Sequence, residues 1–245
     1  MTSFAAPPGL FVTGTDTGVG KTQIAVLIAE QLRSEGVQVG VYKPVCSGAS
    51  SDQAGRIWWD DICRLRDAVR GIWTDDELSD DVVCPQRFLA PLAPPLAARA
   101  ENRAVDIPLL RTGADRWNGR SEFLIVEGAG GFLTPLSETT NVADLACDFR
   151  YPLIVVARCG LGTINHSLLT IEAARRRGLQ IAGVVLNQPH LSDNLELSSD
   201  NAAEIESRGD VPVIGVVSWN SVDIRRHGRT IRIAWQTLTT KCSRG

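Results

Sequence analysis

Apolar residues gather in six short runs along the chain, and glycine, proline or polar residues bound each run. These runs are residues 10–13, 37–42, 123–126, 153–157, 181–186 and 213–217. Several are apolar throughout, whereas a strand with one solvated face would alternate apolar and polar residues. We therefore predict six strands of a buried, mostly parallel sheet.

Two longer segments between these runs have the apolar spacing of amphipathic helices. Residues 22–35 form the first helix, which Gly36 ends, and residues 164–177 form the second, which Gly178 ends. Strands that alternate with helices are typical of folds in which helices cover both faces of a parallel sheet. The pattern predicts a doubly wound α/β fold.

The segment from residue 49 to residue 120 lacks this regularity. It contains four tryptophans and a proline-rich stretch at residues 90–96. We expect short helices and loops inserted between sheet strands, not a separate domain. The chain of 245 residues is then a single domain, residues 1–245, in which residues 236–245 form a flexible polar tail.

The overall charge argues only against one class of partner, nucleic acids. The net charge is −3 and the sequence pI is about 5.7, so there is no electrostatic reason to expect nucleic-acid binding. The first eight residues lack the basic start and apolar stretch of a leader, and no segment has the apolar length of a membrane helix. We expect a cytoplasmic protein that acts on a small molecule, in which the six cysteines are reduced thiols.

A glycine-rich loop, GTDTGVGKT, joins the first predicted strand to the first predicted helix at residues 14–22. Its glycines allow backbone N–H groups to surround phosphate oxygens, Lys21 adds positive charge, and the Thr22 hydroxyl suits a magnesium ion. The usual spacing places a glycine where Thr15 stands, so the loop is a variant. It predicts a P-loop NTPase-like fold that binds ATP through Thr15, Asp16, Thr17, Gly18, Val19, Gly20, Lys21, Thr22 and Gln23.

Two further strand ends carry charged residues. Lys43 and Ser47 follow the second predicted strand, and Glu127 ends the third, directly before Gly128, Ala129 and Gly130. Open α/β sheets bind ligands at the carboxyl ends of their strands, so we expect Lys43 near the phosphates. An acid at such a strand end is the usual partner of a phosphate-binding loop, and Glu127 is predicted to help hold magnesium.

Two weaker signals lie later in the chain. Leu161, Gly162, Thr163 and Asn165 open the helix at residues 164–177, where free N–H groups suit a carboxylate or phosphate. The same residues are equally compatible with an ordinary turn and helix cap. Asn187 and Gln188 follow the fifth strand, and their amides can bind an adenine edge or simply form a turn.

Taken together, four segments resemble the dethiobiotin synthetase family in order and spacing. These are residues 13–22, residues 42–48, residues 126–136 and residues 161–166. The resemblance implies an ATP-dependent ligase of biotin biosynthesis that converts 7,8-diaminononanoate and carbon dioxide into dethiobiotin, ADP and phosphate. A carbamate, which ATP phosphorylates, would be the intermediate.

The resemblance also implies roles for individual residues. Lys43 and Lys21 would be catalytic, and Thr22, Asp61 and Glu127 would hold magnesium, with Asp60 as the alternative to Asp61. Thr17, Lys43 and Ser47 would contact the diamine. The residues of the 161–165 helix start would bind the substrate carboxylate from the neighbouring subunit of a homodimer. Nucleotide contacts would extend to Asn187, Gln188, Ser218 and Trp219, although the family commonly has a proline after the last strand.

Two other classes share the phosphate loop. The cobyrinic acid a,c-diamide synthases are related amide ligases, but they need a glutaminase site, and this chain has no convincing Cys and His pair for one. Partition-type ATPase switches typically carry an additional lysine early in the loop, which is absent here. The dethiobiotin synthetase resemblance explains more residues than either alternative does.

Overall fold

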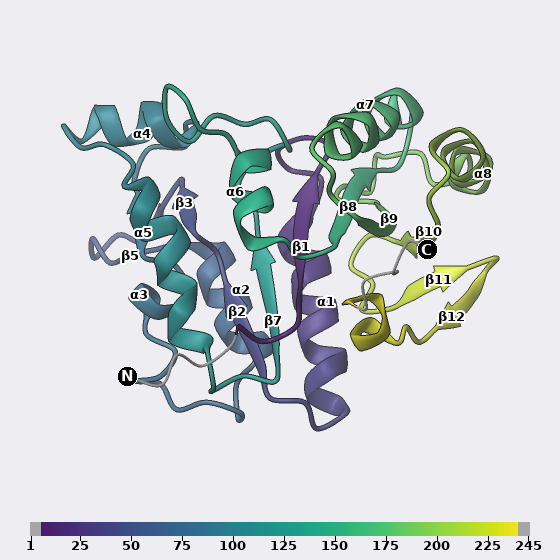
Figure 1. Ribbon diagram of the computed structural model, residues 1–245. Coiled ribbons are helices and arrows are strands. Elements are labelled where there is room, and N and C mark those ends of the chain that lie inside the picture. The colour runs from purple at the N-terminus through teal and green to yellow at the C-terminus, as the bar shows by residue number, and fades with distance from the viewer. Residues whose placement is uncertain (1–5, 240–245) are drawn as a thin grey trace.

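In the computed structural model, residues 6–239 are described, and they form a central sheet with helices on both faces and two small two-stranded sheets (Figure 1). All six predicted strands are present, which confirms the α/β prediction. Their bounds are β1 Gly9–Gly14, β2 Val39–Tyr42, β7 Phe123–Glu127, β8 Leu153–Arg158, β9 Ile181–Asn187 and β10 Val213–Val217.

The central sheet has eight strands in the order β12-β11-β10-β9-β8-β1-β7-β2. The six predicted strands pair in parallel, whereas β11 (Ile224–Arg226) and β12 (Arg229–Ile231) add an antiparallel edge that was not predicted. From β1 the chain crosses to β2 on one side of the sheet and later to β8 on the other. This reversal of direction places a crevice at the carboxyl end of β1, where open sheets bind ligands.

Both predicted helices form, α1 at Lys21–Ser34 and α7 at Thr163–Arg176. Two more, α6 (Val142–Phe149) and α8 (Ser198–Gly209), were not predicted. The start of α6 carries a capping box in which the Asn141 side chain accepts from the Asp144 N–H and the Asp144 side chain accepts from the Asn141 N–H. That pair is a recognisable helix signal in the sequence.

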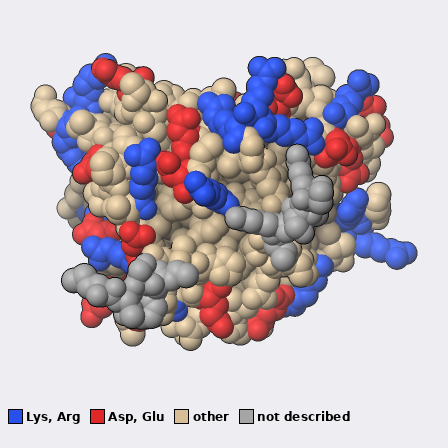
Figure 2. All heavy atoms as spheres, in the orientation of Figure 1, with Lys and Arg blue, Asp and Glu red and all other residues tan. Residues whose placement is uncertain are grey.

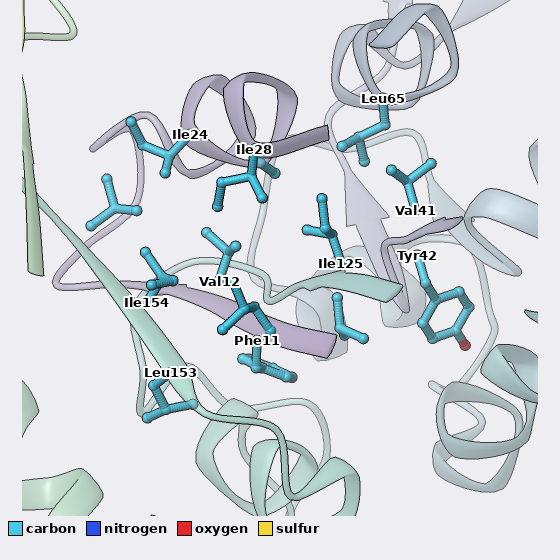
Figure 3. Packing of buried hydrophobic residues seen from close by; sticks show 14 of the residues in the cluster. Phe11, Val12, Ile24, Ile28, Val41, Tyr42, Leu65, Ile125, Leu153 and Ile154 are labelled. Atoms are coloured by element: carbon cyan, nitrogen blue, oxygen red, sulfur yellow. The ribbon is translucent and has the colours of Figure 1, made fainter. Parts of the chain in front are cut away.

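The core lies on both faces of the sheet because successive strand residues point in opposite directions. Figure 3 shows Ile24 and Ile28 of α1 on the same side of the strands as Val12. Phe11 and Tyr42 point to the other face, where their rings lie 6.2 and 6.1 Å from the ring of Phe149 at the end of α6. The packing therefore fixes α1, and with it the phosphate loop, against the centre of the sheet.

The irregular segment forms short elements inserted between β2 and β7; the short helices and loops were predicted, whereas the four short strands were not. These are β3 Val45–Ser47, β4 Ser50–Ser51, β5 Ile57–Trp58, α2 Asp60–Ala68, α3 Asp80–Val83, β6 Gln86–Phe88, α4 Pro94–Ala100, α5 Ile107–Thr112 and the 3₁₀ helix η1 Gly113–Trp117. Trp73 and Trp117 pack edge to face, and the Trp73 indole donates to the Val39 carbonyl at 2.8 Å. These two tryptophans fill the core beside β2.

The last described residues form the 3₁₀ helix η2 (Trp235–Thr239), in which Trp235 is buried and donates to Gln31 Oε1 at 3.0 Å. The remainder of the predicted tail, residues 240–245, lies outside the described residues. Within residues 6–239, no helix has both the length and the apolar character needed to cross a membrane. Positive and negative side chains are interspersed over the face shown in Figure 2.

Candidate active site

The glycine-rich loop connects β1 to α1, and two of its glycines are required by close contacts. Gly20 has a φ of 91°, and a Cβ there would lie 2.0 Å from the Asn187 side-chain nitrogen. A Cβ on Gly14 would lie 2.9 Å from Val19 Cγ2. The variant spacing is thus accommodated because Gly14 provides the tight start of the loop. No side chain caps α1, which leaves the N–H groups of its first turn available to an anion.

Lys21 lies at the first position of α1 and is almost completely buried. Its ammonium donates to the Asp16 carbonyl at 3.1 Å. Burial and the nearby charge of Lys43 lower the pKa of Lys21 to about 8. A bound phosphate would counter both effects, because it brings negative charge to the ammonium.

Four side chains, three from α1, α2 and β7 and one that directly follows β2, meet beside the loop, and we call them the carboxylate cluster: Thr22, Lys43, Asp61 and Glu127. The Thr22 hydroxyl oxygen lies 2.9 Å from Asp61 Oδ1 and 2.7 Å from Glu127 Oε1, and its single proton can be donated to either. The Lys43 ammonium lies 2.7 Å from Asp61 Oδ2 and 2.6 Å from Glu127 Oε1. Lys43 and Glu127 are therefore in direct contact, although 84 positions separate them in the chain.

The charges in this cluster depend on one another. Burial alone would lower the pKa of Lys43, but the carboxylates of Glu127 and Asp61 raise it well above its usual value. Burial likewise opposes ionisation of Asp61, and the ammonium of Lys43 lowers the pKa of that carboxyl below its usual value. Lys43 is therefore held as a cation and Asp61 as a carboxylate, although burial opposes the charge of each.

The oxygen groups of the cluster suit magnesium, which prefers carboxylate and hydroxyl oxygens together with substrate phosphates. One oxygen, Glu127 Oε2, is buried and has no hydrogen-bond partner in residues 6–239. No group of three or more His, Cys, Asp or Glu side chains in that range can hold a metal by itself. Of the two candidate aspartates, Asp61 faces the cluster, whereas Asp60 accepts from Ser50 and Trp58 at 2.7 and 2.8 Å.

The cluster opens into a cavity of about 280 Å³. The predicted residues that line it are Thr17, Gly18, Gly20, Lys21, Thr22, Lys43, Ser47, Asp61, Glu127, Ala129 and Gly130. Arg64 and Cys46 also line it, and neither was predicted. Arg64 follows Asp61 by three residues, so the helical spacing that brings them to one face was the available signal. Burial raises the pKa of the Cys46 thiol to about 12, which makes it an inert neighbour.

The predicted nucleotide contacts at the ends of β9 and β10 lie beside the loop. The Asn187 side chain is buried and donates to the Val19 carbonyl at 3.0 Å, so it stabilises the conformation of the glycine-rich loop. Gln188 accepts from the Trp219 N–H at 3.0 Å, which links the two strand ends. Ser218 belongs to the same connection, and Gln23 donates to the Ser221 carbonyl at 3.2 Å.

The predicted carboxylate-binding residues at the start of α7 are not in this cavity. Leu161 is 98% exposed, and Gly162 caps the helix with a φ of 86°. A separate hollow of about 380 Å³ lies between the other side of the loop and α7, lined by Thr15, Asp16, Gly131, Phe132, Leu133, Thr134, His166, Leu169, Thr170 and Ala173. Within one chain, the start of α7 therefore stands apart from Lys43.

A doubly wound sheet with this loop and a buried acid at the adjacent strand end defines a P-loop nucleotide-binding protein. A family profile described as an AAA domain (AAA_26) matches residues 8–223. The ATP-dependent dethiobiotin synthetase BioD of Anaeromyxobacter dehalogenans (strain 2CP-C) is 42% identical over 91% of this chain and 95% of its own. That of Bacillus cereus (strain B4264) is 41% identical over 85% and 82%. The chain belongs to the ATP-dependent dethiobiotin synthetase family.

A solved structure supports the fold alone. The signal recognition particle receptor FtsY from Elizabethkingia anophelis, in complex with GDP, has a TM-score of 0.50 and 14% identity. The match covers 98% of this chain and 64% of that one. The predicted family and ATP-dependent ligase class are confirmed by the named relatives. The predicted fold is confirmed by the sheet and the family profile.

Proposed function

We propose that this protein closes the cyclic urea of dethiobiotin from 7,8-diaminononanoate and carbon dioxide, converting ATP to ADP and phosphate. The observation that carries the proposal is the contact between Lys43 and the carboxylates of Asp61 and Glu127 beside the phosphate loop. A cavity that binds phosphates on one wall and holds a buried lysine on another suits a reaction between two anionic groups. The proposal is consistent with the family to which the chain belongs.

In this reaction, one amine of the substrate attacks carbon dioxide, and loss of a proton gives a carbamate. A carbamate oxygen then attacks the terminal phosphorus of ATP, and ADP leaves. The second amine attacks the carbonyl carbon, the ring closes, and phosphate leaves. The attack of the carbamate on ATP brings two negative groups together, so Lys43 and Lys21 would stabilise charge as it gathers on the carbamate and phosphoryl oxygens.

Magnesium fits this site because three oxygen groups, one hydroxyl and two carboxylates, converge there, and Thr22, Asp61 and Glu127 would hold it. When bound, it would neutralise part of the charge on the phosphates of ATP. Lys43 contacts two of the same side chains, so its ammonium occupies part of the space between them in this structure. We propose that Lys43 donates instead to the carbamate when substrate and nucleotide are present.

The remaining substrate contacts belong to the proposal of a homodimer. Ser47 lines the cavity and would contact the diamine or its carbamate. The start of α7 would bind the substrate carboxylate of the neighbouring subunit through Gly162, Thr163 and Asn165. Leu161, just before α7, is 98% exposed, and Leu169 of α7 is 60% exposed. The proposed interface would cover both apolar side chains.

The test is a product assay on the purified protein with 7,8-diaminononanoate, bicarbonate, magnesium and ATP. ADP release is followed, and the cyclic urea is identified by mass spectrometry with ¹³C-labelled bicarbonate. We expect one labelled dethiobiotin for each ADP. The Asp60→Asn variant is the matched control, because Asp60 bonds Ser50 and Trp58 outside the cavity and its loss should leave the product ratio unchanged.

Two results would contradict the proposal. ATP hydrolysis that ignores the diamine would indicate a nucleotide switch, and ADP formation without label in the product would exclude carbon dioxide as the carbon source. Omission of magnesium should abolish product while leaving the fold intact by circular dichroism. Product formed at an undiminished rate with a chelator present would remove the metal from the proposal.

A further inference from the structure

Arg64 is a cation in the cavity whose charge no carboxylate offsets within residues 6–239. Three cations line this cavity: Lys21, Lys43 and Arg64. Lys43 is held between two carboxylates, and Lys21 is buried against the loop carbonyl of Asp16. The guanidinium of an arginine, in contrast, keeps its charge at every pH at which a protein is folded.

The position of Arg64 follows from α2. It lies one helical turn beyond Asp61, so the element that supplies the proposed metal ligand also carries the guanidinium to the mouth of the cavity. Its Nη2 donates to the side-chain oxygen of Gln23, which lies in the first turn of α1 directly after Thr22. Gln23 in turn donates to the Ser221 carbonyl at 3.2 Å. Arg64 is thus held over the phosphate-binding end of α1.

The hydrogen-bond partner of Arg64, the side-chain amide of Gln23, leaves the positive charge of the guanidinium unpaired. An amide oxygen orients a guanidinium without neutralising it, whereas a carboxylate would do both. Arg64 is exposed and lines the cavity, so solvent or a ligand can reach its side chain. A guanidinium with a planar array of donors is well suited to the oxygens of a polyphosphate, which it can bind in a bidentate manner.

We propose that Arg64 is an additional phosphate-binding residue that contacts the polyphosphate of the nucleotide from α2. This inference rests on the proposed nucleotide site and adds a contact from outside the glycine-rich loop. Through Gln23 and Ser221, the same contact connects α2 with the segment that follows β10. A polyphosphate in the loop would therefore connect α1, α2 and the segment around Ser221, which lie far apart in the sequence.

The test compares Arg64→Gln with the wild type by calorimetry, using three probes: ATP, inorganic tripolyphosphate and adenosine. We expect the affinities for ATP and tripolyphosphate to fall about tenfold, the usual effect of losing one charged hydrogen bond, and the affinity for adenosine to stay unchanged. Arg64→Lys should recover part of the loss because it restores charge without the planar donors. The loss for ATP should shrink as salt is added.

The matched control is Arg70→Gln. Arg70 follows the carboxyl end of the same helix, pairs with Asp67 at 2.9 Å and does not line the cavity, so its loss should change none of the three affinities. Thermal unfolding of both variants would identify any general loss of folding.

Unchanged affinity of Arg64→Gln for tripolyphosphate would overturn the inference. An equal loss for adenosine would overturn it too, because Arg64 would then support the segment around Ser221 and not the phosphates. The failure of the proposed function is seen separately, in the wild type. If the wild type binds ATP and the tripolyphosphate effect is found but no dethiobiotin forms, the phosphate contact stands and the proposed reaction does not.

Discussion

The carboxylate cluster and the start of α7 both lie at carboxyl ends of sheet strands, yet they are built in opposite ways. Lys43 and Glu127 are 4% and 1% exposed, and each makes short bonds to neighbours within the chain. Leu161 is 98% exposed, and Gly162 caps α7 without any side-chain bond. One region is complete in a single chain, whereas the other offers free backbone donors and an apolar side chain to the outside.

The difference fits the two tasks that we propose for these regions. Groups that stabilise developing charge must be held rigidly before the reaction, and burial among fixed partners provides that. In the proposed dimer, a second subunit would complete the surface that recognises the substrate carboxylate. The predictions below test whether the two regions really divide the work in this way.

The largest effect is expected for Lys43→Gln. Turnover should fall by about a thousandfold or more, because the variant cannot donate a charged hydrogen bond to the carbamate and leaves two carboxylates without their cation. Steady-state kinetics with the diamine measures this, and circular dichroism checks the fold. Turnover within tenfold of the wild type would remove Lys43 from the chemistry.

The second-largest effect is expected at the start of α7. Leu161→Asp should weaken the dimer and raise the KM for the diamine by about tenfold, with the Kd for ATP unchanged, because a charge at the interface disfavours association. Light scattering with size-exclusion chromatography measures the mass. The control is Ile57→Asp, since Ile57 is 48% exposed on β5, away from α7. A wild type that remains monomeric at high concentration would contradict the shared site.

A pH dependence tests the loop that borders both regions. Lys21 in the free protein loses its proton above about pH 8, whereas a bound phosphate keeps it protonated. Binding of ADP without metal should therefore take up a proton, and its affinity should fall by up to about tenfold per pH unit above pH 8. Below about pH 7 this dependence disappears, because Lys21 is protonated in both states.

Calorimetry in buffers of different ionisation enthalpy measures that proton uptake. The Lys21→Arg variant stays charged throughout and should bind ADP with no such dependence between pH 8 and pH 10. A wild-type affinity that is constant over the same interval would show that the burial of Lys21 does not control its charge.

The smallest effect is expected for Asn187→Ala. The change removes a buried hydrogen bond to the Val19 carbonyl, so the free energy of unfolding should fall by about 1–2 kcal/mol and ATP affinity by only a few-fold. Denaturant unfolding measures the first. Asn118→Ala, which removes an exposed hydrogen bond to Asp115, is the control and should be nearly neutral. A loss of ATP affinity of a hundredfold would show that Asn187 also binds the base.

Much of the fold was predictable because local patterns and long-range packing agree. The apolar runs of β1, β2, β7, β8, β9 and β10 are buried on both faces of the sheet, and they carry a strong signal. β11 and β12 lie at the edge, are three residues long and are rich in arginine, so their pattern is weak. α6 was missed although its capping box is visible in the sequence.

By itself, the sequence determined the phosphate loop and the strand ends at Lys43 and Glu127, because these depend on residues adjacent in the chain. The sequence favoured Asp61 over Asp60 through the family resemblance, and the tertiary structure shows that the Asp61 side chain faces the cluster while Asp60 bonds Ser50. The position of Arg64 beside Gln23 and the hydrogen bond from Asn187 to the loop became visible only in the tertiary structure. Each depends on the packing of α2 or β9 against the loop. Such contacts join residues tens to hundreds of positions apart, and no local pattern encodes the distance between them.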